Sequence, residues 1–168
     1  MEVKRKVIAM QRQLLIKLSD YEADIGRLYE AYAAAFPELA EFWQTLARDE
    51  KKHAAFLSSM LSLADKGKVF FGFGKYDKEA IRASQTAVLN EWAAVQAGPV
   101  TLRHALRFAF EIETLLLDGQ FYASITSDAG EYELIAKHLQ KDEQLHLALV
   151  KRVFRERFVA EVDAPQAD

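Results

Sequence analysis

The sequence has no cysteine, no long apolar run and no strong excess of either charge. Without cysteine, disulfides, iron–sulfur clusters, thiolate zinc sites and cysteine nucleophiles are excluded, and a reducing compartment is expected. The basic N-terminus, MEVKRKVIAM, is followed by polar residues that interrupt any stretch of signal-peptide or membrane-span length. These are Gln11, Arg12, Gln13 and Lys17. We therefore expect a cytoplasmic protein with no membrane segment.

Size and charge narrow the class of protein further. The formal net charge of −3 is too small to predict a nucleic-acid partner. At 168 residues, of which 51% are hydrophobic, the chain is long enough for one domain with a sizeable core. We expect residues 1–168 to form that single domain.

Apolar residues recur every three or four positions along almost the whole chain, which is typical of α-helices. Pro37, the segment AGP and the segment SDAGE interrupt this pattern. No segment shows the alternation of a strand. The pattern predicts long helices at about 7–36, 38–63, 101–126 and 132–158, and a shorter helix at about 78–96.

The lengths of the connections predict how these helices are arranged. Short connections join the first two and the last two long helices, so each pair should form an antiparallel hairpin. The crossover, residues 64–100, contains the shorter helix, which would span roughly 30 Å at about 1.5 Å per residue. We expect an all-α four-helix bundle of two hairpins. The apolar segment VFFGFG (69–74) should either cap the bundle or contact another subunit, as in a homodimer.

One five-residue pattern occurs twice, in RDEKKHAAF (48–56) and in KDEQLHLAL (141–149). Both segments contain Asp-Glu-x-x-His. Residues three apart lie on the same face of a helix, so Glu50 points the same way as His53, and Glu143 the same way as His146. In both helices that face is the apolar one, which should be buried.

Each of the other two long helices carries an acid on its apolar face. These acids are Glu22 and Glu113, and their separations along the chain from Glu50 and Glu143 are nearly equal. Glu113 is preferred to Glu111, whose face carries more polar residues. A carboxylate in an apolar seam is costly unless it is paired or bound to a cation. We therefore expect these acids to meet at one depth in the bundle.

The expected set combines four carboxylates with two imidazoles: Glu22, Glu50, His53, Glu113, Glu143 and His146. Two divalent cations would balance the four negative charges. Each metal would take one histidine and one terminal carboxylate, and two carboxylates would bridge. Oxygen ligands with some imidazole favour two iron ions, or manganese, over zinc. This ligand set is a known pattern of di-iron helical bundles.

With these residues the sequence resembles the ferritin-like superfamily, and it is most similar to the rubrerythrin-like group. The segment EADIGRLY (22–29) matches the spacing of a ligand Glu and a Tyr in that group, and ALRFAFEIE (105–113) is similar to its third-helix ligand segment. The resemblance also implies that Asp49 and Asp142 orient the ligand histidines across the bundle. The alternative for each is a solvated acid that balances Arg48 or Lys141. Tyr29 and Tyr122 are expected near the site.

Two departures qualify the resemblance. Rubrerythrins carry a cysteine-ligated iron domain, and they have a further carboxylate three residues after the third-helix ligand, where this sequence has Leu116. The six-ligand set is closer to bacterioferritin-like sites. The resemblance implies an oxidoreductase that reacts with dioxygen or hydrogen peroxide and receives electrons from an external donor. Its role would be ferroxidase-type or peroxidase-like, or oxidation of an organic substrate. The alternatives are an iron-storage or interaction subunit and a vestigial site.

Overall fold

The computed structural model describes residues 2–66, 71–73, 78–118, 122 and 125–158. Five α-helices make up almost all of this part of the chain, which confirms the expected helical bundle. They are α1 (Glu2–Ala35), α2 (Ala40–Asp65), α3 (Lys78–Ala97), α4 (Leu102–Asp118) and α5 (Gly130–Phe158). Among these described residues, no helix combines the length and the apolar character needed to cross a bilayer.

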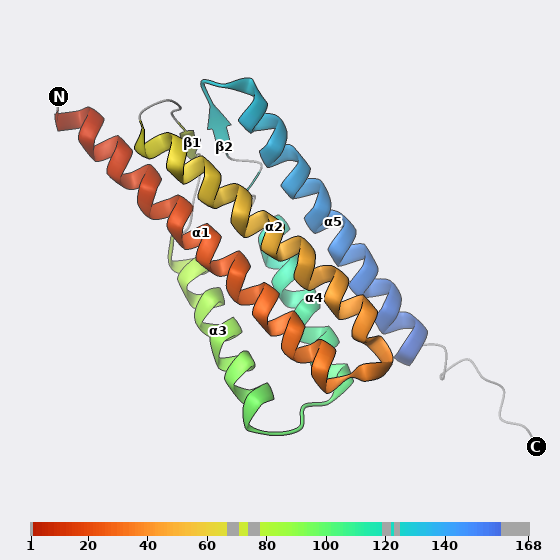
Figure 1. The fold of residues 1–168 in the computed structure, drawn as a ribbon. Coiled ribbons are helices and arrows are strands. Elements are labelled where there is room, and N and C mark those ends of the chain that lie inside the picture. Colours follow the sequence, from red (N-terminus) through yellow and green to blue (C-terminus); the bar gives the residue numbers. More distant parts are fainter. Residues whose placement is uncertain (1, 67–70, 74–77, 119–121, 123–124, 159–168) are drawn as a thin grey trace, which may run out of the picture.

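The chain runs back and forth along the bundle (Figure 1). α1 and α2 are antiparallel and are joined by a short 3-10 turn, Pro37–Leu39, in which proline takes the first position. α4 and α5 form a second antiparallel pair. α3 packs against α1 and returns the chain to the opposite end of the bundle, as expected for the crossover.

The predicted third long helix, 101–126, is wrong at its C-terminal end. α4 ends at Asp118, and Ile125–Ser127 forms a short strand, β2, that pairs antiparallel with β1 (Phe71–Phe73). Phe71 pairs with Ser127 and Phe73 with Ile125. The β-branched residues at 125 and 126 suit a strand, but the pairing depends on a segment about fifty residues away in the sequence. Local periodicity does not report such a contact.

Strand β1 contains the middle of the apolar segment VFFGFG, whereas residues 69, 70 and 74 lie outside the described residues. The two strands lie at the end of the bundle where α2 ends and α5 begins (Figure 1). This position agrees with the capping alternative. The contact with another subunit stays a prediction.

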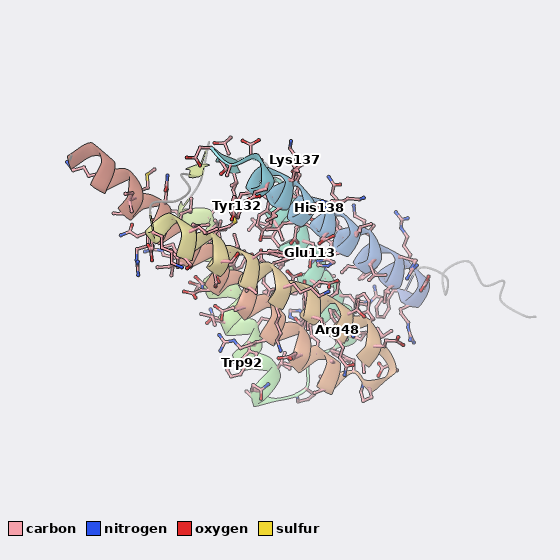
Figure 2. All side chains as sticks on the ribbon, turned by 45° about the horizontal axis from the view of Figure 1, so that its top comes forward. Arg48, Trp92, Glu113, Tyr132, Lys137 and His138 are labelled. Carbon is pink, nitrogen blue, oxygen red and sulfur yellow. The ribbon has the colours of Figure 1, made fainter. Side chains whose placement is uncertain are left out.

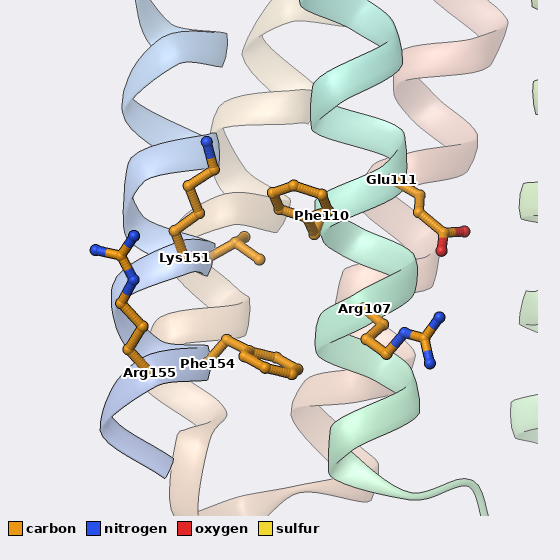
Figure 3. A pocket seen from close by; sticks show the side chains of 7 residues that line it. Arg107, Phe110, Glu111, Lys151, Phe154 and Arg155 are labelled. Atoms are coloured by element: carbon orange, nitrogen blue, oxygen red, sulfur yellow. The ribbon is translucent and has the colours of Figure 1, made fainter. Parts of the chain in front are cut away.

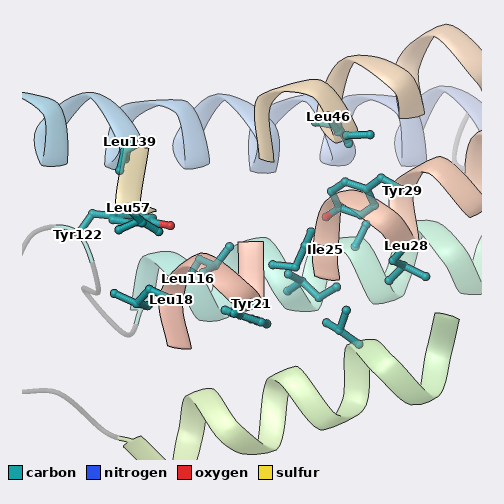
Figure 4. Close-up of a cluster of buried hydrophobic side chains, with 14 of the residues drawn as sticks. Leu18, Tyr21, Ile25, Leu28, Tyr29, Leu46, Leu57, Leu116, Tyr122 and Leu139 are labelled. Atoms are coloured by element: carbon teal, nitrogen blue, oxygen red, sulfur yellow. The ribbon is translucent and has the colours of Figure 1, made fainter. Parts of the chain in front are cut away.

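The core is built mainly from leucine, isoleucine and large aromatic side chains of all five helices (Figure 4). Its largest members, including Trp43, Tyr21, Tyr29 and Tyr32, are fully buried. α1 and α2 approach closely at Gly26, where a Cβ atom would lie 3.3 Å from the Ala47 carbonyl oxygen. Gly26 therefore serves helix packing, because even a methyl group there would make a tighter contact with the α2 backbone than is usual.

Candidate metal centre

The six residues singled out from the sequence meet in the middle of the bundle. α1 supplies one of them, α4 one, and α2 and α5 two each. All six are at most 5% exposed: Glu22, Glu50, His53, Glu113, Glu143 and His146. In Figure 2, Glu113 lies within the bundle, whereas Arg48, Lys137 and His138 lie on its outside. Glu111 is also exposed, so the structure brings Glu113 and not Glu111 into the cluster.

Apolar residues about one turn away on each helix flank the cluster on both sides. On α1, for example, Leu18 precedes Glu22 and Ile25 follows it, and both leucine and isoleucine are fully buried. The other three helices repeat this order, with flanking pairs Leu46 and Leu57, Ala109 and Leu116, and Leu139 and Val150. Buried apolar residues therefore lie above and below the polar layer along the bundle axis. Because these residues share helical faces with the acids and histidines, the apolar periodicity of the sequence placed the six residues in the core.

The ligand-type atoms form two groups that share two carboxylates. Within each group, one atom from every residue lies within 4.8 Å of the others. The first group is Glu22, Glu50, His53 and Glu143, and the second is Glu50, Glu113, Glu143 and His146. Each group can hold one metal ion, because four buried oxygen and nitrogen donors converge on it.

Both imidazoles turn the same atom toward the cluster. His53 Nδ1 lies 2.9 Å from Glu143 Oε1, and His146 Nδ1 lies 2.9 Å from Glu50 Oε1. The two rings are stacked, with centroids 5.6 Å apart. Nδ1 is therefore the nitrogen that each histidine offers to a cation.

The opposite nitrogen of each histidine faces an acid from the other repeat. His53 Nε2 lies 3.5 Å from Asp142 Oδ2, and His146 Nε2 lies 3.6 Å from Asp49 Oδ2. This crossed arrangement agrees with the expected role of the two aspartates. No hydrogen bond joins either pair at these distances, and His53 Nε2 has no hydrogen-bond partner in the described part of the chain. A carboxylate on this side nevertheless favours a proton on Nε2 and leaves Nδ1 to bind a metal.

Without a cation the carboxylates cannot all be ionised. Burial raises the pKa of Glu22, and the charges of Glu50 and Glu143 raise it further. Burial and the same kind of repulsion also raise the pKa values of Glu113 and Glu143. Burial opposes the charged form of Glu50 as well, but its close contacts with His146 and His53 outweigh burial and lower that pKa. The metal-free cluster therefore retains protons on some carboxylates.

The histidines carry the compensating positive charge in this state. Burial lowers the pKa of His53, but Glu143 and Glu50 outweigh it and raise the pKa to about 10. For His146, burial is likewise outweighed, mainly by Glu50, and the pKa is raised. Protons thus occupy positions that a cation would take, and metal binding must release them.

Hydrogen bonding within the cluster is incomplete, which fits a cation-binding role. Many of its buried atoms have no hydrogen-bond partner, including both carboxylate oxygens of Glu22 and of Glu143 and one of Glu113. Such atoms are costly in a protein interior unless something else binds them. The four acids together present more oxygen atoms than the cluster has donors to satisfy.

Tyr29 connects the cluster to the aromatic core. Its hydroxyl donates to Glu113 Oε1 at 2.6 Å, and burial, followed by the Glu113 charge, raises the pKa of this phenol. The Tyr29 ring packs on Trp43 and Tyr32, at centroid distances of 5.6 and 6.4 Å. Tyr122 also lies near the site, with its ring centroid 6.4 Å from that of His53. Both tyrosines were expected there.

A buried acid on the crossover helix α3 was missed from the sequence. Glu91 accepts a hydrogen bond from the Tyr32 hydroxyl at 2.9 Å, and its other oxygen lies 3.0 Å from His104 Nε2. Glu91 shares a helical face with the buried Ile81 and Val88, so the periodicity of α3 contained the signal. His104 itself is about half exposed, as expected for a residue off the ligand faces.

Comparison with known proteins found no relative of this chain. The sequence matches no family model, and neither the curated proteins nor the solved structures include a significant match to the chain. Inferences about function therefore depend on the site itself.

Proposed function

We propose that this chain is a ferritin-like protein that binds two iron ions, or two manganese ions, and reacts with dioxygen or peroxide. The carrying observation is the pair of buried donor groups that share Glu50 and Glu143. Glu22 and His53 would hold one ion, and Glu113 and His146 the other.

The donor set favours iron or manganese. Each group contributes three carboxylates and one imidazole, whereas protein zinc sites more often have four ligands with more nitrogen or sulfur. Two redox-active ions, when bound, supply the electrons that dioxygen or peroxide takes up.

The protein residues around the ions would perform three tasks. The flanking apolar layers exclude water from the polar layer, which strengthens charge interactions there. Asp49 and Asp142, which face the Nε2 atoms at 3.6 and 3.5 Å, would favour the tautomer with the proton on Nε2. Tyr29 keeps its proton and orients Glu113 by a short hydrogen bond. The electrons for turnover would come from an external donor.

Metal analysis of freshly purified protein tests the ligand assignment. We expect about two ions per chain in the wild type and in Glu111→Gln, whose side chain is exposed. Glu50→Ala, Glu143→Ala should lose at least one ion, since both residues belong to both donor groups. Full occupancy in this double variant would place the metals elsewhere.

Ferrous oxidation in air tests the reaction. The wild type should oxidise Fe²⁺ faster than buffer alone, and His53→Ala, His146→Ala should not. Equal rates for the wild type and this variant would contradict an oxidase function. Size in solution then separates the two roles: a large closed shell would indicate iron storage, whereas a monomer or dimer has no space for a mineral.

A further inference from the structure

A groove of about 450 Å³ lies between α4 and α5 on the outside of the bundle (Figure 3). Its apolar walls are the side chains of Phe110 on α4 and Phe154 on α5, with Val150 beneath them. Val150 is fully buried, and Phe110 is 38% exposed. An aromatic ring that exposed on a helix surface leaves apolar area that a ligand can cover.

Three cations line the same groove: Arg107, Lys151 and Arg155. All three are exposed, and none forms an ion pair with any residue in the described part of the chain. The Lys151 ammonium lies 5.4 Å from the centre of the Phe110 ring, so positive charge adjoins the aromatic wall. Among the described residues that line the groove, Glu111 is the single acid. The charge of the groove therefore selects an anion.

The length of the groove limits the size of that anion. Its lining spans residues 107–111 on α4 and 150–155 on α5. At about 1.5 Å per residue, these segments are roughly 6 to 8 Å long. This length accommodates one or two fused rings and is too short for an extended long acyl chain lying along the helices.

We propose that this groove binds a small aromatic carboxylate. The ring would pack against Phe110 and Phe154, and the carboxylate would face Lys151 and Arg155. The groove also adjoins the candidate metal centre, because Phe110 precedes Glu113 by one turn and Val150 follows His146 by one turn. A role for the ligand in oxidation rests on the proposed function, whereas binding itself does not require metal.

Binding is tested by NMR titration of the metal-free wild-type protein with naphthoate at low salt. A ligand of this size should bind with a Kd of roughly 1 mM or tighter. Naphthalenemethanol, which has the same rings without the charge, should bind at least about tenfold more weakly, since it cannot use the charge-assisted contacts. Equal affinity for the two probes would overturn the proposed recognition of an anion.

Matched variants locate the site. Lys151→Gln, Arg155→Gln should weaken naphthoate binding on the order of tenfold, because it removes two charges from the rim. Arg152→Gln, Arg157→Gln removes the same charge from exposed positions on α5 outside the groove and should leave Kd unchanged. Equal weakening in both variants would show that overall charge, and not the groove, governs binding.

Two further outcomes decide the matter. Phe110→Ser should also weaken binding, and since this side chain is partly exposed the variant is expected to fold. Normal binding by Phe110→Ser would overturn the proposal. So would a wild-type dimer that the groove variants convert to a monomer without any probe, because the groove would then be covered by a second copy of the chain. Because metal is absent throughout, failure here leaves the metal assignment unaffected.

Discussion

The double variant Glu22→Gln, Glu113→Gln should separate the stability of the fold from the stability that metal confers. Both carboxyl groups are fully buried, and burial and neighbouring acids raise both pKa values, so the metal-free protein holds them largely protonated. A neutral amide of the same shape replaces a protonated acid with little change. We expect the free energy of unfolding of the metal-free protein to change by less than about 1 kcal/mol.

Metal should affect the wild type and the variant differently. A metal at a hundredfold excess over its Kd stabilises the folded state by about 2.7 kcal/mol. At roughly 2–4 °C per kcal/mol for a chain of this size, the melting temperature should rise by about 5–10 °C. The variant should show almost none of this rise in melting temperature, because the first donor group has lost the carboxylate of Glu22 and the second that of Glu113.

The assay is thermal unfolding followed by circular dichroism, with and without Mn²⁺ as an air-stable probe. Glu111→Gln provides the control, since it makes the same chemical change on α4 at an exposed position. It should gain as much stability from metal as the wild type. If the double variant also gains as much, metal does not join the four helices at this cluster, and the reasoning behind the proposed function is wrong.

The pH dependence has a definite sign. Raised pKa values of Glu22 and His53 mean that the folded metal-free protein binds more protons than the unfolded chain. Its stability should therefore fall as pH rises, and for His53 the loss extends from the ordinary pKa near 6.5 to about 10. Metal competes with these protons, so the stabilisation by Mn²⁺ should increase between about pH 6 and pH 8. A stabilisation by Mn²⁺ that decreases over this pH range would contradict the linkage between metal binding and proton release.

Three further substitutions test features around the site. Gly26→Ala should lower the free energy of unfolding by about 1–3 kcal/mol in urea denaturation, because the new Cβ meets the backbone of α2. Gly98→Ala should have little effect, because an added Cβ would lie more than 4 Å from every described residue other than its chain neighbours. Tyr32→Phe should cost about 1 kcal/mol by the same measurement, since Glu91 loses a buried hydrogen bond. Asp142→Asn should weaken Mn²⁺ affinity by about 10- to 100-fold in calorimetry, and unchanged affinity would exclude its proposed role beside the histidine.

The sequence predicted those features that depend on one helix at a time. The positions of Glu22, Glu50, Glu113 and Glu143 on apolar faces follow from local periodicity, and the structure brings all four together. The choice of Glu113 over Glu111 likewise needed only the polarity of the two faces. These predictions succeeded because a helix fixes the direction of each side chain.

Features that depend on pairing between distant segments were not predictable in this way. Strands β1 and β2 form through backbone hydrogen bonds between segments about fifty residues apart, and three-residue strands leave no periodic pattern. The groove between α4 and α5 depends on the packing of two helix surfaces. Glu91 differs from these features, because the periodicity of α3 alone places it on the buried face with Ile81 and Val88. It was missed because α3 carries no second acid or histidine beside it that would have suggested a buried site.

The sharing of Glu50 and Glu143 between the two donor groups has a consequence for the order of assembly. Each hairpin supplies three residues to its own group and one to the group of the other hairpin. Neither hairpin alone can therefore complete a four-donor group, and tight metal uptake has to wait until the halves have docked. A stopped-flow refolding experiment with metal present should show metal capture in the last phase. If metal binds at these groups, it would stabilise only chains whose two hairpins have docked correctly. Two separately expressed halves should then require metal to remain associated.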